Sequence, residues 1–281
     1  MELTIPMASG VFVKFTTGST GGKGYPTAGL QKGFLLVHDA QDLVEEGVGF
    51  GVPILKRGIQ TIFPGSGNLI SIQKDSTHKV TEVVVIYRMN LEEKVVKPGF
   101  ESVKSNILYT MKNILAVFIR RIPFLRSPLT AVSNALRWMF GWQTTYEKAP
   151  FSTDVKVIYS FDCETGAITV EVDTAHLDKE GITEVVVMNG QGALTFDQYC
   201  DSNGTSLHGD EIGCWDKVTS EWASFVSLTH RLAFSLRQVK GATIFRGREL
   251  VGSRLAWSGF GISFPPASGK FIYQLRIKRL Q

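Results

Sequence analysis

Reactive side chains are densest between residues 197 and 221. Paired carboxylates beside a histidine can act as general acid and base, and a tryptophan can stack on the apolar face of a pyranose ring. This composition predicts a carbohydrate-binding or carbohydrate-processing site, and the alternative is a long loop of solvated charges. The candidate catalytic residues are His208, Asp210 and Glu211, and the candidate ligand-binding residues are Trp215 and Asp216.

Two further candidates lie in residues 222–236, where the alternation of side chains predicts one long strand. His230 falls on the apolar face of this predicted strand, and Arg231 follows it. His230 could be a core histidine with satisfied hydrogen bonds, or a site residue that works with Arg231 or a loop carboxylate. We therefore add His230 to the candidate catalytic residues and Arg231 to the candidate ligand-binding residues.

Nucleotide-binding motifs are incomplete in this chain. Residues 22–24 read Gly-Lys-Gly, whereas a P-loop needs Ser or Thr after the lysine to hold magnesium. Alternate glycines occur in residues 47–51, but no strand–helix–strand unit surrounds them, as a dinucleotide site requires. These glycines instead indicate a bent sheet edge or one wall of a ligand groove.

Metal and cofactor sites are not predicted. The segment from His208 to Glu211 offers three donors, but only a suitable local fold would bring them to one ion. The cysteines, Cys163, Cys200 and Cys214, are odd in number and lack a repeated spacing. That pattern argues against a disulfide framework and against a cysteine zinc site. We therefore expect no cofactor and no metal.

The elements that position these residues are mostly strands. A continuous apolar run predicts a buried strand at residues 80–91. Turn residues predict two hairpins, one around residues 164–166 and one around residues 189–192. A last strand is predicted at residues 270–278, where apolar and polar side chains alternate.

Residues 103–142 are the exception, because their apolar side chains recur every three or four positions. Pro123 ends a first predicted helix, and Ser127 and Pro128 begin a second, so we predict a helical hairpin. We expect this hairpin to cover the sheet. The alternative is docking to an anionic membrane surface or a protein partner through its basic face, formed by Lys112, Arg120, Arg121 and Arg126.

The predicted fold is mainly β: a large antiparallel β-sandwich of the supersandwich kind with an inserted α-helical hairpin. We expect a single domain over residues 1–281, with the helical insert at 101–142. The alternative division has two β halves, 1–100 and 151–281. The size and strand pattern resemble the large sandwiches of sugar-mutarotase and polysaccharide-lyase domains, a likeness of fold without a matching motif.

The net charge and the N-terminal sequence bear on the predicted partners and location. A net charge of +4 is too small to predict nucleic-acid binding. The N-terminus lacks the basic start and apolar run of a signal peptide, so a cytoplasmic location is expected. The predicted function is carbohydrate binding or processing, with a carbohydrate or small polar ligand as partner. The alternative is a non-catalytic scaffold that docks through the basic insert, and the residues do not decide whether the protein is an enzyme.

Overall fold

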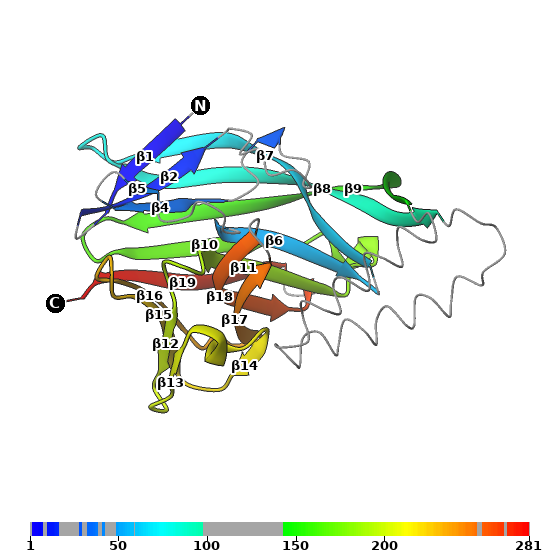
Figure 1. The fold of residues 1–281 in the computed structure, drawn as a ribbon. Coiled ribbons are helices and arrows are strands. Elements are labelled where there is room, and N and C mark those ends of the chain that lie inside the picture. The colour runs from blue at the N-terminus through cyan, green and yellow to red at the C-terminus, as the bar shows by residue number, and fades with distance from the viewer. Residues whose placement is uncertain are drawn as a thin grey trace. The chain divides into compact units, whose positions relative to one another are not determined.

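The described part of the chain is built from strands and two short 3-10 helices. The computed structural model describes residues 2–7, 10–16, 28–29, 33–38, 41–42, 49–58, 60–97, 143–251, 255–266 and 269–280. The mainly β fold predicted from the sequence is confirmed (Figure 1). The predicted helical insert, residues 101–142, lies outside the described residues.

Two compact units divide the chain. One comprises Met1–Leu91 and Phe151–Gln281, and the other comprises Glu92–Pro150. The described residues of the second unit belong to the end of one long strand and the start of the next. Every residue discussed below as part of a site belongs to the first unit.

The strands have the following bounds. The first half of the chain contains β1 (Glu2–Pro6), β2 (Val11–Thr16), β3 (Ala28–Gly29), β4 (Leu35–His38), β5 (Gln41–Asp42), β6 (Gly49–Arg57), β7 (Gln60–Lys74) and β8 (Val80–Lys97). The second half contains β9 (Gln143–Asp162), β10 (Ala167–Asp173), η3 (Asp178–Glu180), β11 (Glu184–Gln191), β12 (Gln198–Asp201), β13 (Ser206–His208), η4 (Gly209–Ile212), β14 (Asp216–Val218), β15 (Trp222–Ser227), β16 (Leu232–Arg237), β17 (Thr243–Val251), β18 (Leu255–Phe264) and β19 (Lys270–Arg279).

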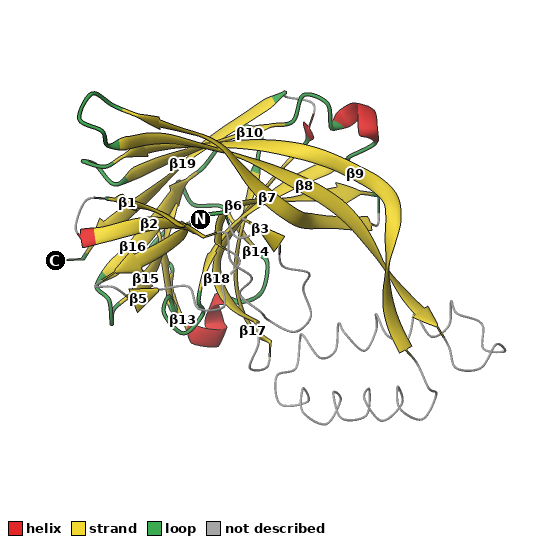
Figure 2. Cartoon of the chain, turned by 90° about the horizontal axis from the view of Figure 1, so that it is seen from above, coloured by secondary structure: helices red, strands yellow, loops and turns green. Residues whose placement is uncertain are grey.

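Within the described residues these strands form two sheets. The smaller sheet has the order β1-β2-β4-β5, and the larger, fifteen-stranded sheet has the order β13-β12-β15-β16-β19-β10-β9-β8-β7-β6-β11-β18-β17-β14, with β3 attached to β7. Pairing is antiparallel, as predicted, apart from the two-residue parallel pair of β3 with β7. Figure 2 shows the strands of the larger sheet from above.

Aromatic side chains bring distant strands of the larger sheet face to face. The ring of Phe234 on β16 lies 5.1 Å from Phe50 on β6 and 5.8 Å from Phe260 on β18, measured between centroids. All three side chains are buried. The larger sheet therefore folds over itself. The core lies between two groups of strands, one that contains β16 and one that contains β6 and β18, as in a sandwich.

A buried polar network joins the same two groups of strands. The hydroxyl of Tyr159 on β9 donates to the carbonyl of Gly51 on β6 over 2.9 Å, and it lies 2.7 Å from the hydroxyl of Tyr87. The side-chain oxygen of Asn189 on β11 accepts from the Gly51 amide at 3.1 Å and from the Tyr273 hydroxyl at 2.7 Å. Each buried hydroxyl thus has a partner, which removes the desolvation penalty of an unpaired group.

The structure accounts for the glycine at position 51. The residue has φ +74°, and a Cβ there would lie 2.3 Å from the ring of Tyr159. The pairing of β6 with β11 also shifts register between Met188 and Asn189, which marks a bulge opposite Gly51. At Gly49 and Phe50 the strand β6 pairs with β11, whereas its pairing with β7 is confined to Leu55–Arg57. The bent sheet edge expected at the glycines of residues 47–51 therefore stays a prediction.

The structure also tests the two predicted hairpins and the predicted last strand. The hairpin around residues 164–166 is confirmed by the pairing of β9 with β10, and the last strand is confirmed as β19. The second predicted hairpin is wrong. Its first strand, β11, pairs with β6 and β18, whereas β12 pairs with β13 and β15. Asn189-Gly190 lies within β11, where Asn189 serves the buried network and not a turn.

We expect Tyr159→Phe to lower the free energy of unfolding by about 1–3 kcal/mol, because the Gly51 carbonyl and the Tyr87 hydroxyl lose a buried partner. Urea denaturation followed by circular dichroism measures the change. Ser160→Ala is the control, since Ser160 is the next residue of β9 and points to the opposite face. An equal loss in both variants would contradict the role of the network.

Alkaline pH should act on the same network. Burial raises the pKa of Tyr87, Tyr159 and Tyr273 above the ordinary value of 10.0. Because the unfolded chain releases these protons first, the free energy of unfolding should be unaffected below pH 10 and should fall progressively above it. Urea unfolding from about pH 8 to about pH 12 tests this expectation. Tyr273→Phe should show a shallower fall, and an unchanged slope would rule out its contribution.

Candidate functional site

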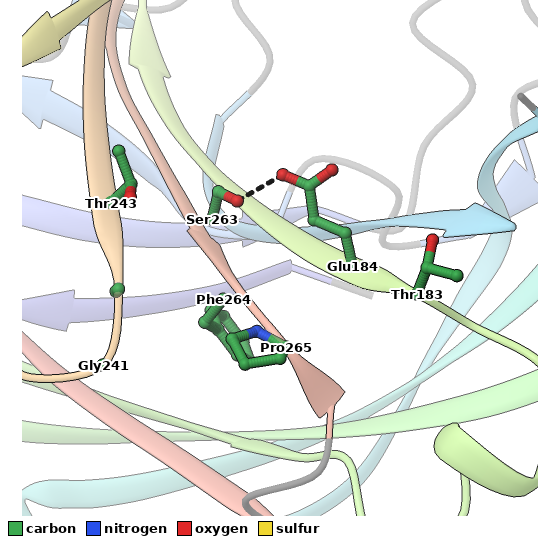
Figure 3. A pocket seen from close by; sticks show the side chains of 8 residues that line it. Thr183, Glu184, Gly241, Thr243, Ser263, Phe264 and Pro265 are labelled. Carbon is green, nitrogen blue, oxygen red and sulfur yellow. Dashed lines mark hydrogen bonds between the residues drawn. The ribbon is translucent and has the colours of Figure 1, made fainter. Parts of the chain in front are cut away.

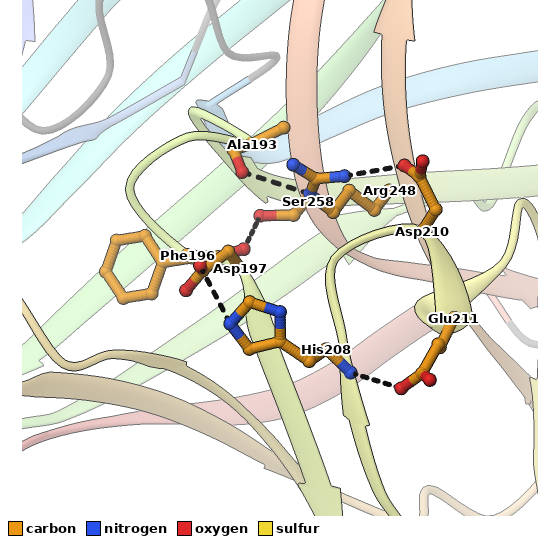
Figure 4. A network of polar contacts seen from close by, with 8 residues as sticks. All are labelled: Ala193, Phe196, Asp197, His208, Asp210, Glu211, Arg248 and Ser258. Atoms are coloured by element: carbon orange, nitrogen blue, oxygen red, sulfur yellow. Dashed lines mark hydrogen bonds and ion pairs between the residues drawn. The ribbon is translucent and has the colours of Figure 1, made fainter.

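Two arginines of β17 hold the segment that carries the candidate residues. The Arg248 Nε donates to the carbonyl of Ala193 over 3.1 Å, and its Nη1 lies 3.0 Å from Asp210 Oδ1 (Figure 4). The Arg246 Nε donates to the carbonyl of Ile212 over 3.1 Å. These bonds attach the chain to β17 at Ala193, Asp210 and Ile212.

The acidic candidates Asp210 and Asp216 are partners of these arginines. The Arg248 side chain is only 9% exposed, whereas its partner Asp210 is 85% exposed. Arg246 is also mostly buried, and its Nη2 lies 3.8 Å from Asp216 Oδ2. Both carboxylates therefore balance the charge of a buried arginine, which is a structural task.

His208 and Glu211 form the start of η4. The backbone amide of His208 donates to the Glu211 carboxylate over 3.2 Å, and together the two residues make a capping box. The His208 Nε2 lies 3.2 Å from Asp197 Oδ2, and both side chains contact solvent. Figure 4 shows His208 turned toward Asp197, away from Asp210 and Glu211. The catalytic role predicted for His208, Asp210 and Glu211 stays a prediction.

Trp215 packs against β17 and β18 of the larger sheet. Its ring stacks on Phe245 with centroids 5.2 Å apart and an interplanar angle of 8°, and it meets Trp257 edge-on at 6.3 Å. A Cβ on Gly261 would lie 2.2 Å from the indole, so glycine is required beneath it. The side chain remains 37% exposed. Its ligand-binding role stays a prediction, and the geometry leaves part of the indole open to a ligand.

His230 and Arg231 lie in a turn, which corrects the prediction of one long strand. Residues 222–236 form a hairpin in which β15 pairs with β16, and residues 228–231 connect them. The His230 amide donates to Ser227 Oγ over 3.3 Å, and Arg231 has φ +50°. Local hydrogen bonds of this kind reverse the chain without the usual Gly or Pro signal. His230 lies near His38 of β4, with ring centroids 6.4 Å apart.

The structure presents a different concave site. An open hollow of about 550 Å³ lies at the ends of β11, β17 and β18 (Figure 3). Its lining residues are Thr183, Glu184, Gly241, Ala242, Thr243, Ser263, Phe264 and Pro265. The Ser263 hydroxyl donates to the Glu184 carboxylate. None of the candidates predicted from the sequence lines this hollow.

Sequence reasoning missed the hollow for a physical reason. Its residues come from three segments, at 183–184, 241–243 and 263–265, and none of these contains a motif. Only the pairing of β18 with both β11 and β17 brings them together. The available signal was weak: a glutamate and a threonine at the start of one predicted strand.

Other site types find little support in the described residues. The described residues contain no group of three or more His, Cys, Asp or Glu arranged to hold a metal ion. No helix in the described ranges is long and apolar enough to cross a membrane. The four basic residues predicted as a docking surface, Lys112, Arg120, Arg121 and Arg126, lie outside the described part of the chain.

Comparison with known proteins gives structural resemblances only. No protein-family model and no curated protein sequence matches the chain. The alpha-N-acetylgalactosaminidase NagBb from Bifidobacterium bifidum, in complex with GalNAc, matches with 10% identity and a TM-score of 0.47. The match covers 99% of this chain and 36% of that chain, so this chain spans about a third of that protein's length.

Two smaller proteins match over nearly their whole length. The Slr1438 protein from Synechocystis is 7% identical, with a TM-score of 0.41 and coverage of 99% of this chain and 96% of its own. A galactose mutarotase-like protein from Lactobacillus casei is 10% identical, with a TM-score of 0.40 and coverage of 99% of both chains. TM-scores below 0.5 carry no conclusion about a shared site or activity.

Arg248→Ala should destabilise the protein by roughly 1–3 kcal/mol, because the buried Ala193 carbonyl loses its donor. Asp210→Ala should cost less than about 1 kcal/mol, because its carboxylate is mostly solvated. Urea denaturation compares the two variants, and limited proteolysis reports whether residues 193–216 loosen. Equal losses would show that the ion pair, and not the bond to the backbone, holds the segment.

Proposed function

We propose that the protein binds a carbohydrate in the hollow formed by Thr183, Glu184, Thr243 and Ser263. The observation that carries the proposal is the chemistry of the lining: three hydroxyls and one carboxylate gathered around one open space. The volume of about 550 Å³ falls in the range of small-molecule sites.

Hydroxyl-rich linings suit hydroxyl-rich ligands. A threonine or serine hydroxyl can donate one hydrogen bond and accept two, as the hydroxyls of a sugar can. The Thr183 hydroxyl donates to the carbonyl of Lys56, and the Ser263 hydroxyl donates to Glu184, so both oxygens remain as acceptors for a ligand. A carboxylate accepts only, and hydrogen bonds to a charged group are about twice as strong as neutral ones. Glu184 is therefore the side chain that can contribute most to holding adjacent sugar hydroxyls.

The bond between Ser263 and Glu184 orders the site before a ligand arrives. Because the Ser263 proton is directed to the carboxylate, the lone pairs of the serine oxygen remain for a ligand hydroxyl. Glu184 retains further acceptor positions on its two oxygens. A site arranged in this way loses less conformational entropy on binding.

The proposal is of binding and not of glycoside hydrolysis. Among the described residues that line the hollow, Glu184 is the one carboxylate, whereas most glycoside hydrolases place two carboxyl groups about the scissile bond. The loop residues Asp210 and Asp216 are paired with arginines and do not line this space.

Glu184→Gln should weaken sugar binding by about tenfold to a hundredfold, the loss expected for hydrogen bonds to a charged acceptor. Ser263→Ala should weaken it less. Isothermal titration with a panel of neutral monosaccharides measures both effects. Glu164→Gln is the control, because it removes an exposed carboxylate in the turn between β9 and β10. Wild-type affinity in Glu184→Gln would sink the proposal.

A further inference from the structure

Trp215 lies beside the hollow on the same face of the sheet. Thr243 pairs with Ser263 at the hollow, and the next outward-facing pair along β17 and β18 is Phe245 with Gly261. Trp215 covers this second pair, because its ring stacks on Phe245 and leaves no room for a Cβ on Gly261. Residues two apart on a strand share a face and are separated by about 7 Å. The exposed indole and the polar hollow are therefore neighbours.

The position of Trp215 is built into the local backbone. The residue has φ +67°, an unusual conformation for a non-glycine side chain, and the segment around it is fastened by Arg246 and Arg248. The stacked ring beneath and the edge of Trp257 beside it fix the plane of the indole. A rigid aromatic surface loses little entropy when a ligand covers it.

We propose that the ligand is an oligosaccharide, with one pyranose in the hollow and the adjoining pyranose stacked on Trp215. This inference rests on the proposed function, because it needs the hollow to hold a sugar. A pyranose has an apolar face formed by its C–H groups, which matches the face of an aromatic ring. A single ring in the hollow would leave the indole uncovered, whereas a glycan of two or more rings covers both.

Trp222 provides a matched control. It is 38% exposed, nearly the same fraction as Trp215. However, it lies on β15 opposite Arg237 of β16 and is not among the residues that line the hollow. Removing either indole deletes the same chemical group from the surface, but only the loss of Trp215 should affect the ligand.

The experiment compares monosaccharides with the matching disaccharides. Glucose is compared with maltose and cellobiose, and galactose is compared with β-linked galactobiose. Isothermal titration should show that wild-type protein binds at least one disaccharide about tenfold more tightly than its monosaccharide, or ~1.4 kcal/mol. Trp215→Ala should lose this gain and keep the affinity for the monosaccharide. Trp215→Phe should restore part of it, and Trp222→Ala should behave as wild type.

The outcomes separate this inference from the proposed function. Wild-type protein that binds monosaccharides in a Glu184-dependent way, but binds disaccharides no more tightly, overturns the role of Trp215 and leaves the proposed function standing. Full disaccharide affinity in Trp215→Ala would also overturn the role of Trp215 alone. So would a loss of disaccharide affinity in Trp222→Ala that equals the loss in Trp215→Ala. Absence of binding to every sugar overturns both. Circular dichroism of each variant confirms that it is folded.

Discussion

The hydrogen bonds around Gly51 join β6 to β9 and β11 in the core of the first unit. The carbonyl of this residue accepts from the Tyr159 hydroxyl on β9, and its amide donates to the side chain of Asn189 on β11. Asn189 also accepts from the Tyr273 hydroxyl on β19. Because all of these groups are buried, none can exchange its partner for water, and each must stay satisfied for the fold to form. The network thereby fixes the register of β6 on β11, and with it the strands that carry the hollow.

The densest group of reactive residues in the sequence makes several structural contacts. Asp210 and Asp216 compensate buried arginines, and Glu211 caps a short helix with His208. Between the short strands β12, β13 and β14, which pair with neighbouring strands, backbone carbonyls such as that of Ile212 accept from arginine side chains instead. Trp215 packs on Phe245 and against Trp257, and its side chain is still 37% exposed.

Sequence periodicity predicted the fold better than the site. Alternation identified β19 and the hairpin of β9 and β10, because one buried face imposes a two-residue repeat. It failed at residues 222–236, where the alternation continues through a turn built on a serine hydroxyl and a positive φ at Arg231. The turn-residue prediction failed at Asn189, where an asparagine typical of turns serves a buried network. The hollow could not be predicted from the sequence, because its residues meet only through pairings of strands distant in sequence.

The two faces of β18 carry different duties at alternate positions. Phe260 and Ile262 are buried in the core, whereas Gly261 supports Trp215 and Ser263 lines the hollow. Substitutions at the outward positions can therefore change the surface chemistry without removing apolar contacts from the interior. In evolutionary terms, ligand preference and thermodynamic stability can be selected almost independently along this single strand. The exception is Gly261, where the indole above forbids any side chain and ties the surface to one backbone geometry.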